Sequence, residues 1–293
     1  MDPVGVAFGI TSAVSWGLSD FAGGLASRML GSITTATVGQ ALGFLAIAAL
    51  TMAAGESALV GQEVAWAVVA GVGGSIGLAS LYRALAVGDM SLVAPLTGAV
   101  GAGVPVVASF AVGETVGPAQ VAGIGCALVA VVVVSISPGS GSGLGSDGAP
   151  WRVLPLVVAA GLGFASFYLA IDQAVAVGGH LWQPLLVARA SSLAVFVALM
   201  VGLALGKRPG RPGIGAVAMR WPLLLVAGIG DLGGNLFFVL ANAISPLSIA
   251  VVLSSLYPVV TALLAAMVLG ERLRPRQAAG ALLALAAIVL IAA

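Results

Sequence analysis

Apolar residues in this chain gather into ten long runs, which short polar stretches separate. A membrane-spanning helix needs about 20 mostly apolar residues, and each run has about that length. The predicted spans are residues 4–25, 32–54, 63–87, 91–112, 117–136, 152–177, 182–205, 221–244, 247–269 and 275–293. The pattern predicts an all-α integral membrane protein with ten transmembrane helices and no soluble domain.

One stretch of sequence occurs twice. Residues 113–123 read GETVGPAQVAG and residues 270–280 read GERLRPRQAAG, so both fit Gly-Glu-x-x-x-Pro-x-Gln-x-x-Gly. The offset is 157 (271 − 114), and the same offset carries residues 70–96 onto 227–253 without a gap. Such a match over several apolar runs indicates an internal duplication.

The duplication divides the chain into two five-helix repeats, residues 1–136 and 151–293. Between them, residues 137–150 (SPGSGSGLGSDGAP) have the composition of a flexible linker. Because each repeat has an odd number of helices, the second repeat must enter the membrane from the opposite side. The repeats are therefore expected to be inverted, as in many secondary transporters, with a substrate site at the repeat interface.

The repeated turn suits a tight connection between two helices. Pro118 and Pro275 fit a first helical turn, where the N–H that proline lacks would have no partner. Glu114 and Glu271 precede that turn, where a carboxylate suits free backbone N–H groups. Gly123, like its copy, lets helices approach closely. We interpret the turn as a helix cap and packing contact; the alternative is that one of the glutamates is a transport carboxylate.

The composition excludes several classes of function. The chain is 60% hydrophobic and 7% charged, whereas a soluble domain carries about 25% charge. A net charge of +1 gives no case for nucleic acid binding. With one cysteine, Cys126, and one histidine, His180, neither a disulfide nor a metal site is expected, and no cofactor is predicted. The expected partners are the lipid bilayer and a small-molecule substrate, and a monomer is expected.

The basic residues are predicted to lie on one face of the membrane. That face holds the connections after the first, third, fifth, seventh and ninth helices, with Arg28, Arg83, Arg152, Lys207, Arg208, Arg211, Arg220, Arg272, Arg274 and Arg276. The opposite face holds Glu56, Glu63, Glu114 and His180, and neither Lys nor Arg. Since basic residues favour the cytoplasmic side, both termini are predicted to lie outside the cytoplasm, with Glu114 outside and Glu271 inside.

Polar residues inside the span 221–244 are the first candidates for a substrate site. Asp231, Asn235 and Asn242 recur at helical spacing on one face. A charged side chain at mid-membrane costs about 2.5–3.5 kcal/mol on the insertion scale and is a functional candidate by default. The counterparts in the first repeat are the apolar residues Gly74, Leu78 and Leu85. We predict that the three polar residues line a cavity; the alternative is interhelical hydrogen bonding.

Asp231 is also the candidate proton carrier, because it is the most deeply placed ionisable residue in the predicted arrangement. A buried carboxylate can trade a proton for substrate, as an antiporter requires. On this hypothesis, Asp231→Asn keeps the fold and abolishes proton-dependent efflux.

Four charged residues are candidates for gates. Asp20 and Arg83 lie toward the predicted cytoplasmic ends of their helices, and Asp172 and Arg189 toward the outer ends. A salt bridge that forms only when one side is shut is the kind of bistable element that alternating access requires. The alternative for Asp20 and Arg83 is a helix-end position without a gating role. Arg189 is also a candidate for binding a substrate carboxylate through two hydrogen bonds.

Aromatic and helix-bending residues complete the predicted site. Trp16, Tyr168 and Tyr257 lie inside helices, where they can stack on a flat or apolar substrate group. Tyr82 and Ser254 are the further candidates within spans. The spans 91–112 and 247–269 carry prolines beside glycines or serines, so we expect them to bend and to form moving walls of the cavity.

The ten helices, the two inverted halves and the repeated turn resemble the drug/metabolite transporter superfamily, in its EamA-type branch. Ser15-Trp16-Gly17 and residues 184–189 (PLLVAR) are also similar to that family. The resemblance implies gradient-driven export of small metabolites across the inner membrane, often of amino acids, and extends to the aromatic amino acid exporters. The chain departs from it at Gln40, where an arginine matching Arg189 is expected. Relatives are often drawn with cytoplasmic termini, opposite to the charge count.

The leading hypothesis is a secondary exporter of amino acids or similar small metabolites, and its nearest alternative is a drug/proton antiporter for organic cations. An ATP-driven pump is not expected, because no phosphate-binding loop occurs. An embedded enzyme is not expected either, because no H-E-x-x-H or G-x-S-x-G motif occurs. A membrane scaffold or receptor is the distant alternative.

Overall fold

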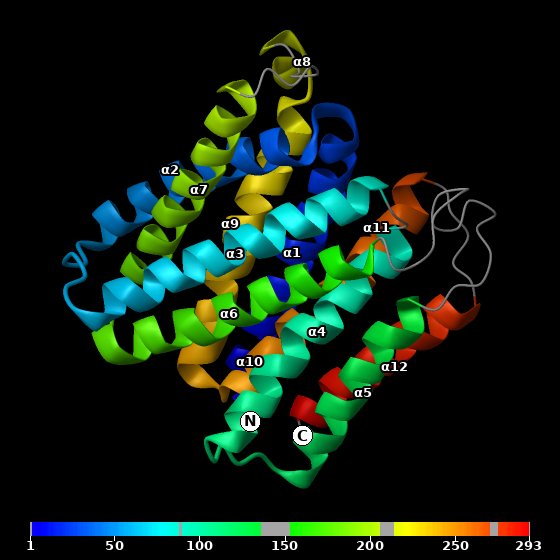
Figure 1. The fold of residues 1–293 in the computed structure, drawn as a ribbon. Coiled ribbons are helices and arrows are strands. Elements are labelled where there is room, and N and C mark those ends of the chain that lie inside the picture. Colours follow the sequence, from blue (N-terminus) through cyan, green and yellow to red (C-terminus); the bar gives the residue numbers. More distant parts are fainter. Residues whose placement is uncertain (1, 88–89, 136–152, 206–213, 270–274, 293) are drawn as a thin grey trace.

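The computed structural model describes residues 2–87, 90–135, 153–205, 214–269 and 275–292, and every regular element in these ranges is a helix (Figure 1). The helices are α1 (Pro3–Leu30), α2 (Ser32–Ala54), α3 (Gln62–Val87), α4 (Met90–Ala111), α5 (Pro118–Ser135), α6 (Leu154–Gly178), α7 (Gln183–Leu205), α8 (Ile214–Met219), α9 (Trp221–Ile244), α10 (Leu247–Ser254), α11 (Tyr257–Leu269) and α12 (Pro275–Ala292). The predicted linker, 137–150, lies outside the described residues.

Local residue chemistry explains several helix ends. α1 begins after Asp2, whose Oδ1 accepts a hydrogen bond from the backbone N–H of Val4 at 2.8 Å, and Pro3 is its first residue. α2 and α6 end at Gly55 and Gly179, whose left-handed backbones (φ 66° and 67°) suit glycine. These caps place the helix ends within a few residues of the predicted ones.

The helices are apolar enough for a multi-pass membrane protein. By length and composition, α2, α3, α6, α7 and α9 can each cross a membrane, and shorter apolar segments lie in α4, α5, α12 and across α10 and α11. Each predicted span coincides with one helix except 247–269, which is interrupted between Ser254 and Tyr257. Pro258 explains the interruption, since its ring clashes with the carbonyl four residues earlier and it has no N–H to donate. The short helix α8 was not predicted.

The two parts of the chain pack together rather than apart. The most extensive contacts join α3 to α6, α1 to α9 and α5 to α12, and each pairs a helix from residues 2–135 with one from residues 153–292. Figure 1 shows α5 and α12 side by side. These contacts fit a chain of two similar halves, in which α1 to α5 correspond in order to α6, α7, α9, α10–α11 and α12. When each helix is replaced by its counterpart, the α3–α6 contact becomes the α9–α1 contact, and the α5–α12 contact stays the same.

Glycines let some of these helices meet backbone to backbone. A Cβ on Gly163 of α6 would lie 2.5 Å from the N of Gly77 and 2.6 Å from the O of Gly73, both on α3. A Cβ on Gly228 of α9 would lie 2.7 Å from the O of Gly39 on α2. These distances leave no room for a side chain, so glycine sets the separation of the helices at both crossings.

The first copy of the repeated turn confirms part of its interpretation. Pro118 is the first residue of α5, and the backbone N–H of Gly117 donates to Oε1 of Gln120 at 2.8 Å. Glu114 behaves differently from the prediction. Its carboxylate accepts from the backbone N–H of Ser248, with Oε1 at 3.2 Å, at the start of α10 rather than at the start of α5. Glu114 therefore connects two parts of the chain that are distant in sequence.

The second copy of the turn is described only in part. Pro275 is the first residue of α12, as predicted, whereas Glu271 lies outside the described residues. α12 also explains Gly123 of α5, because a Cβ there would lie 3.0 Å from the O of Ala287. The small residue thus permits the close approach of α5 and α12, as expected from the sequence.

A second glutamate ties two connections together on the face predicted to be free of basic residues. The carboxylate of Glu56, which follows α2, accepts hydrogen bonds from the backbone N–H groups of residues 181–183 at 3.1, 3.0 and 2.8 Å, at the start of α7. Ser57 Oγ lies 3.0 Å from His180 Nε2 beside it. Of the ten basic residues predicted on the other face, Arg152, Lys207, Arg208, Arg211, Arg272 and Arg274 lie outside the described residues. Which face is cytoplasmic stays a prediction.

Candidate functional site

A cavity lies among helices from both parts of the chain. Its wall is built from α1, α2, α3, α6, α7, α9 and α11. The polar side chains in the wall are Asp20, Gln40, Arg189, Ser192, Asp231 and Asn235. The aromatic ones are Trp16, Phe164, Phe167, Tyr168 and Tyr257. Such a pocket, mostly apolar with a few convergent polar groups, is typical of small-molecule sites.

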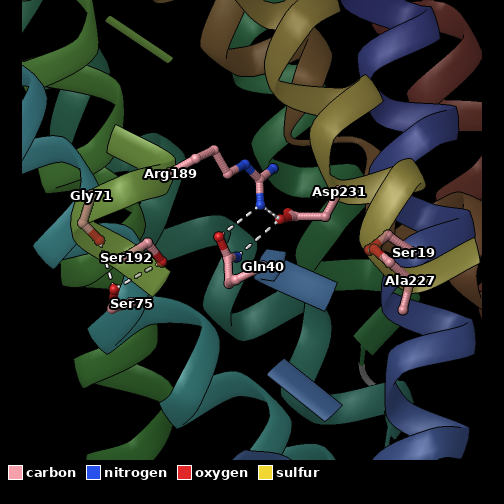
Figure 2. Close-up of polar contacts among 8 residues, drawn as sticks. All are labelled: Ser19, Gln40, Gly71, Ser75, Arg189, Ser192, Ala227 and Asp231. Carbon is pink, nitrogen blue, oxygen red and sulfur yellow. Dashed lines mark hydrogen bonds and ion pairs between the residues drawn. The ribbon is translucent and has the colours of Figure 1, made fainter. Parts of the chain in front are cut away.

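An ion pair forms the polar centre of the cavity (Figure 2). Nη1 of Arg189 on α7 donates to Oδ2 of Asp231 on α9 at 2.5 Å, and the two side chains are 4% and 18% exposed. Gln40 on α2 bridges the pair: its Oε1 accepts from the same Nη1 at 2.8 Å, and its Nε2 lies 3.3 Å from Oδ2 of Asp231. Three helices thus meet through three side chains.

The sequence of α2 makes room for this arrangement. Gly43 lies one turn after Gln40, and a Cβ there would be 3.3 Å from Nη1 of Arg189. The guanidinium therefore rests over a glycine, which leaves it space to reach across to α9. Nη2 of Arg189 is buried and has no hydrogen-bond partner among the described residues.

The charged residues pair differently from the sequence prediction. Arg189 contacts Asp231, whereas Asp172 accepts from Nδ2 of Asn242 at 2.9 Å, between α6 and α9. Asn242 therefore leaves the face that it was predicted to share with Asp231 and Asn235, and neither Asn242 nor Asp172 lines the cavity. The reason is that α9 has a different neighbour at each depth. The spacing along one helix does not show which neighbour each residue meets.

The predicted partners Asp20 and Arg83 lie in different surroundings. Asp20 is 7% exposed and lines the cavity, whereas Arg83 is exposed on α3 and does not. The sequence predicted Asp231 as the most deeply placed ionisable residue, and this prediction is wrong, because both Asp20 and Arg189 are less exposed.

Three aromatic rings of the cavity wall pack against one another. Trp16 lies at the centre of the cluster, with ring centroids 5.8 Å from Tyr168, 6.2 Å from Phe238 and 6.3 Å from Tyr257. Edge-on contacts such as Trp16–Tyr168 are a favoured geometry for aromatic pairs. Tyr257 also has a buried hydroxyl with no partner among the described residues. The structure thus brings together the three aromatic candidates from α1, α6 and α11.

Two further candidates lie outside the cavity. Tyr82 is buried against α1, where a Cβ on Gly23 would fall 2.4 Å from its Cζ. Ser254 is fully buried at the end of α10, and its Oγ has no partner among the described residues.

The structure adds serine contacts that the sequence analysis did not single out (Figure 2). Ser75 Oγ on α3 lies 2.7 Å from the carbonyl O of Gly71 and 2.9 Å from Oγ of Ser192 on α7. Ser19 on α1 donates to the carbonyl O of Ala227 on α9 at 2.7 Å. Serine can return its hydrogen bond to the backbone of its own or a neighbouring helix, so it carries little positional signal in an apolar sequence. Among the described residues, no three His, Cys, Asp or Glu side chains come together as a metal site would need.

Comparison with known proteins places the chain. A solved crystal structure of another protein is similar to it with a TM-score of 0.73 and 21% identity, over 98% of this chain and 95% of that one. This identity establishes a shared fold alone. No curated protein matches the chain. A family model of transporters does match, over residues 3–136 and 151–293. The cavity thus belongs to a transporter of small metabolites, and the chain is a member of the EamA-like transporter family.

Proposed function

We propose that this transporter exports amino acids, or small metabolites of similar charge, across the inner membrane by secondary active transport with alternating access. The observation that carries the proposal is the Arg189–Asp231 ion pair in the cavity wall. Taking two charges out of water is costly, and a buried ion pair often adds little stability. A role in transport therefore accounts for the pair better than a role in stability.

The two charges match the two charged groups of an amino acid. Arg189 has a free Nη2 as well as the Nη1 that Asp231 and Gln40 share. A substrate carboxylate can take both nitrogens in a bidentate contact. Asp231 is then free to bind the substrate ammonium group. The bound zwitterion replaces one internal ion pair by two, so the buried charges stay compensated throughout.

The aromatic cluster suits the rest of the substrate. Trp16, Tyr168 and Tyr257 offer ring faces and edges in the same cavity as the ion pair. Rings of this kind bury apolar or flat groups well. The cavity therefore favours an amino acid with an apolar side chain over a highly charged metabolite.

Alternating access follows from ten spans in two inverted halves, with α10 and α11 together forming one broken span. The helix contacts support this arrangement, since exchanging the halves carries α3–α6 onto α9–α1. The break at Ser255 and Leu256 lies beside Tyr257, so a movement of α10 against α11 reaches the cavity directly. A hinge of a few element-terminal residues is sufficient for such a movement.

An organic-cation antiporter is the second candidate, and two observations favour it. The cavity contains two carboxylates, Asp20 and Asp231, and its aromatic rings can bind a cation by cation–π contact. On this alternative Arg189 serves only to balance charge.

Counterflow into reconstituted vesicles distinguishes the two candidates. Vesicles are loaded with leucine, leucine methyl ester or isopentylamine, and uptake of the labelled compound is measured. The proposal expects exchange of leucine and little exchange of the ester and the amine, because each of these lacks the carboxylate that Arg189 binds. Exchange of the amine and the ester without leucine favours the cation antiporter. Absence of leucine exchange contradicts the proposal.

A further inference from the structure

Asp20 is a cavity carboxylate without a partner in the described part of the chain. It lies on α1, is 7% exposed and lines the same cavity as the ion pair. Among the described residues it has neither a hydrogen bond nor a salt bridge. The other two aspartates within described helices, both half-buried, differ in this respect, since Asp231 binds Arg189 and Asp172 binds Asn242.

The backbone around Asp20 is fixed, so the carboxylate is held in the cavity. Ser19 donates to the carbonyl O of Ala227 on α9 at 2.7 Å. On the other side, Thr261 Oγ1 on α11 donates to the carbonyl O of Gly17 at 3.2 Å. These two contacts tie the part of α1 that carries Asp20 to α9 and α11.

The carboxylate of Asp20 has no positive charge of its own among the described groups that face it. They are Asp231 from α9 and Arg189 from α7, and three tyrosines face it as well: Tyr82 from α3, Tyr168 from α6 and Tyr257 from α11. The guanidinium of Arg189 is already committed to Asp231 and Gln40. The described part of the cavity thus has two carboxylates for one cation. A buried carboxylate without a counter-charge is stabilised by taking up a proton.

We propose that Asp20 is a proton-binding site, separate from the Arg189–Asp231 pair, and that its proton competes with the ammonium group of the transported solute. When Asp20 is ionised, it adds a negative charge beside Asp231 and attracts the ammonium group. When Asp20 is protonated, that attraction is lost. The competition rests on the proposed function, whereas the proton binding does not.

Competition in one cavity has a direct consequence for transport. Two ligands that oppose each other exchange across the membrane, and the coupling is reciprocal: the solute expels the proton as strongly as the proton expels the solute. An inward proton gradient then drives the solute outward, which is the direction that an exporter needs.

Infrared titration of the reconstituted protein without substrate tests the proton site. As the pH is lowered, the wild type should show one carboxylic acid C=O band that Asp20→Asn lacks, in addition to the bands of the other carboxyl groups, which both proteins share. Asp172→Asn is the matched control, a carboxylate in a neighbouring helix that has a partner, and it should keep the band. Should Asp20→Asn fail to fold, Asp20→Glu can be prepared with ¹³C-labelled aspartate. The band of residue 20 then comes from an unlabelled glutamate, so it should not shift with the label. If the wild-type band persists in Asp20→Asn, or still shifts with labelled aspartate in Asp20→Glu, the proposal is overturned.

Binding of labelled leucine tests the competition. In the wild type its affinity should fall on the order of tenfold as the pH is lowered through the infrared transition, and in Asp20→Asn it should not change with pH. Counterflow of leucine with the same pH dependence in both proteins overturns the competition. Absence of leucine counterflow in the wild type contradicts the proposed function instead and leaves the infrared result standing.

Discussion

At the scale of the residue, Arg189 and Asp231 each depend on the charge of the other. Each charge is tolerated at its depth because the other is 2.5 Å away, and Gln40 holds both. Removing one partner of a buried pair typically costs about 3–5 kcal/mol, because it leaves the other charge uncompensated. Because the Asp231 side chain is 18% exposed, we expect the cost of removing one partner here to lie toward the lower end of that range.

A double-mutant cycle checks this dependence. Asp231→Asn and Arg189→Gln should each lower the thermal unfolding temperature in detergent. The double variant should be more stable than the sum of the two changes predicts, because it contains no unpaired charge. Additive losses would show that the pair contributes no coupling.

Arg189→Lys separates charge from geometry. Lysine keeps the positive charge but has no planar fork for a carboxylate. We expect a small change in unfolding temperature and a loss of leucine affinity on the order of tenfold, since one bidentate contact becomes a single hydrogen bond. Equal affinities, measured by equilibrium binding of labelled leucine, would remove Arg189 from carboxylate recognition.

The sequence predicted much of the site and few of its contacts. Asp231, Asn235 and Arg189 stand out because polar groups are costly inside an apolar helix, and all three line the cavity. The partner of Arg189 was not predicted, because it depends on how α7 and α9 face each other across α2. Gln40 was noticed only as a departure from arginine, since one amide in a span is compatible with many roles.

At the scale of the element, the helix crossings depend on glycine. Gly163→Ala should drive α6 away from α3, because the new Cβ would lie 2.5 Å from a backbone N that cannot move aside. We expect a loss of about 1–3 kcal/mol, seen as a lower unfolding temperature. Gly202→Ala in α7 is the matched control, since a Cβ there meets nothing within 4 Å. Equal unfolding temperatures for the two variants would contradict the crossing.

The start of α7 depends on Glu56 from another connection. Glu56→Ala removes the acceptor of three backbone N–H groups. A hydrogen bond to a charged group contributes about 1.5–3 kcal/mol to stability. Amide hydrogen exchange of residues 181–186 should become faster. Glu63→Ala is the control, because Glu63 accepts from Val60 within its own connection. Unchanged exchange in Glu56→Ala would show that α7 begins without this contact.

Helix boundaries were largely predictable, and the reason is local. Apolar runs, prolines and glycines act within a few residues of themselves, and the caps at Asp2, Gly55 and Gly179 lie where such signals place them. Glu114 and Glu56 escaped prediction because each serves a helix distant in sequence. A carboxylate in a turn shows that it can cap a helix without showing which helix.

At the scale of the whole molecule, the sequence predicts two faces that differ in charge, and the predicted orientation follows from that difference. In a Cys126→Ala background, Ser57→Cys should react with a membrane-impermeant maleimide in intact cells, because Ser57 is exposed and lies on the face that is predicted to be free of basic residues. Arg28→Cys should react only after permeabilisation. The reverse labelling would place both termini in the cytoplasm.

The glycine crossings have a mechanical consequence. Side chains that interdigitate lock two helices in one register, because sliding would force packed rotamers past one another. Where α6 meets α3, the side chains of Phe164 and Ser166 on α6 lie over Gly77 and Gly73 on α3, so side chains interlock beside the backbone contact. A slide along this seam would force Phe164 out of its place over Gly77, and separation across the seam would lose the close backbone contact. The seam is therefore stiff in both directions.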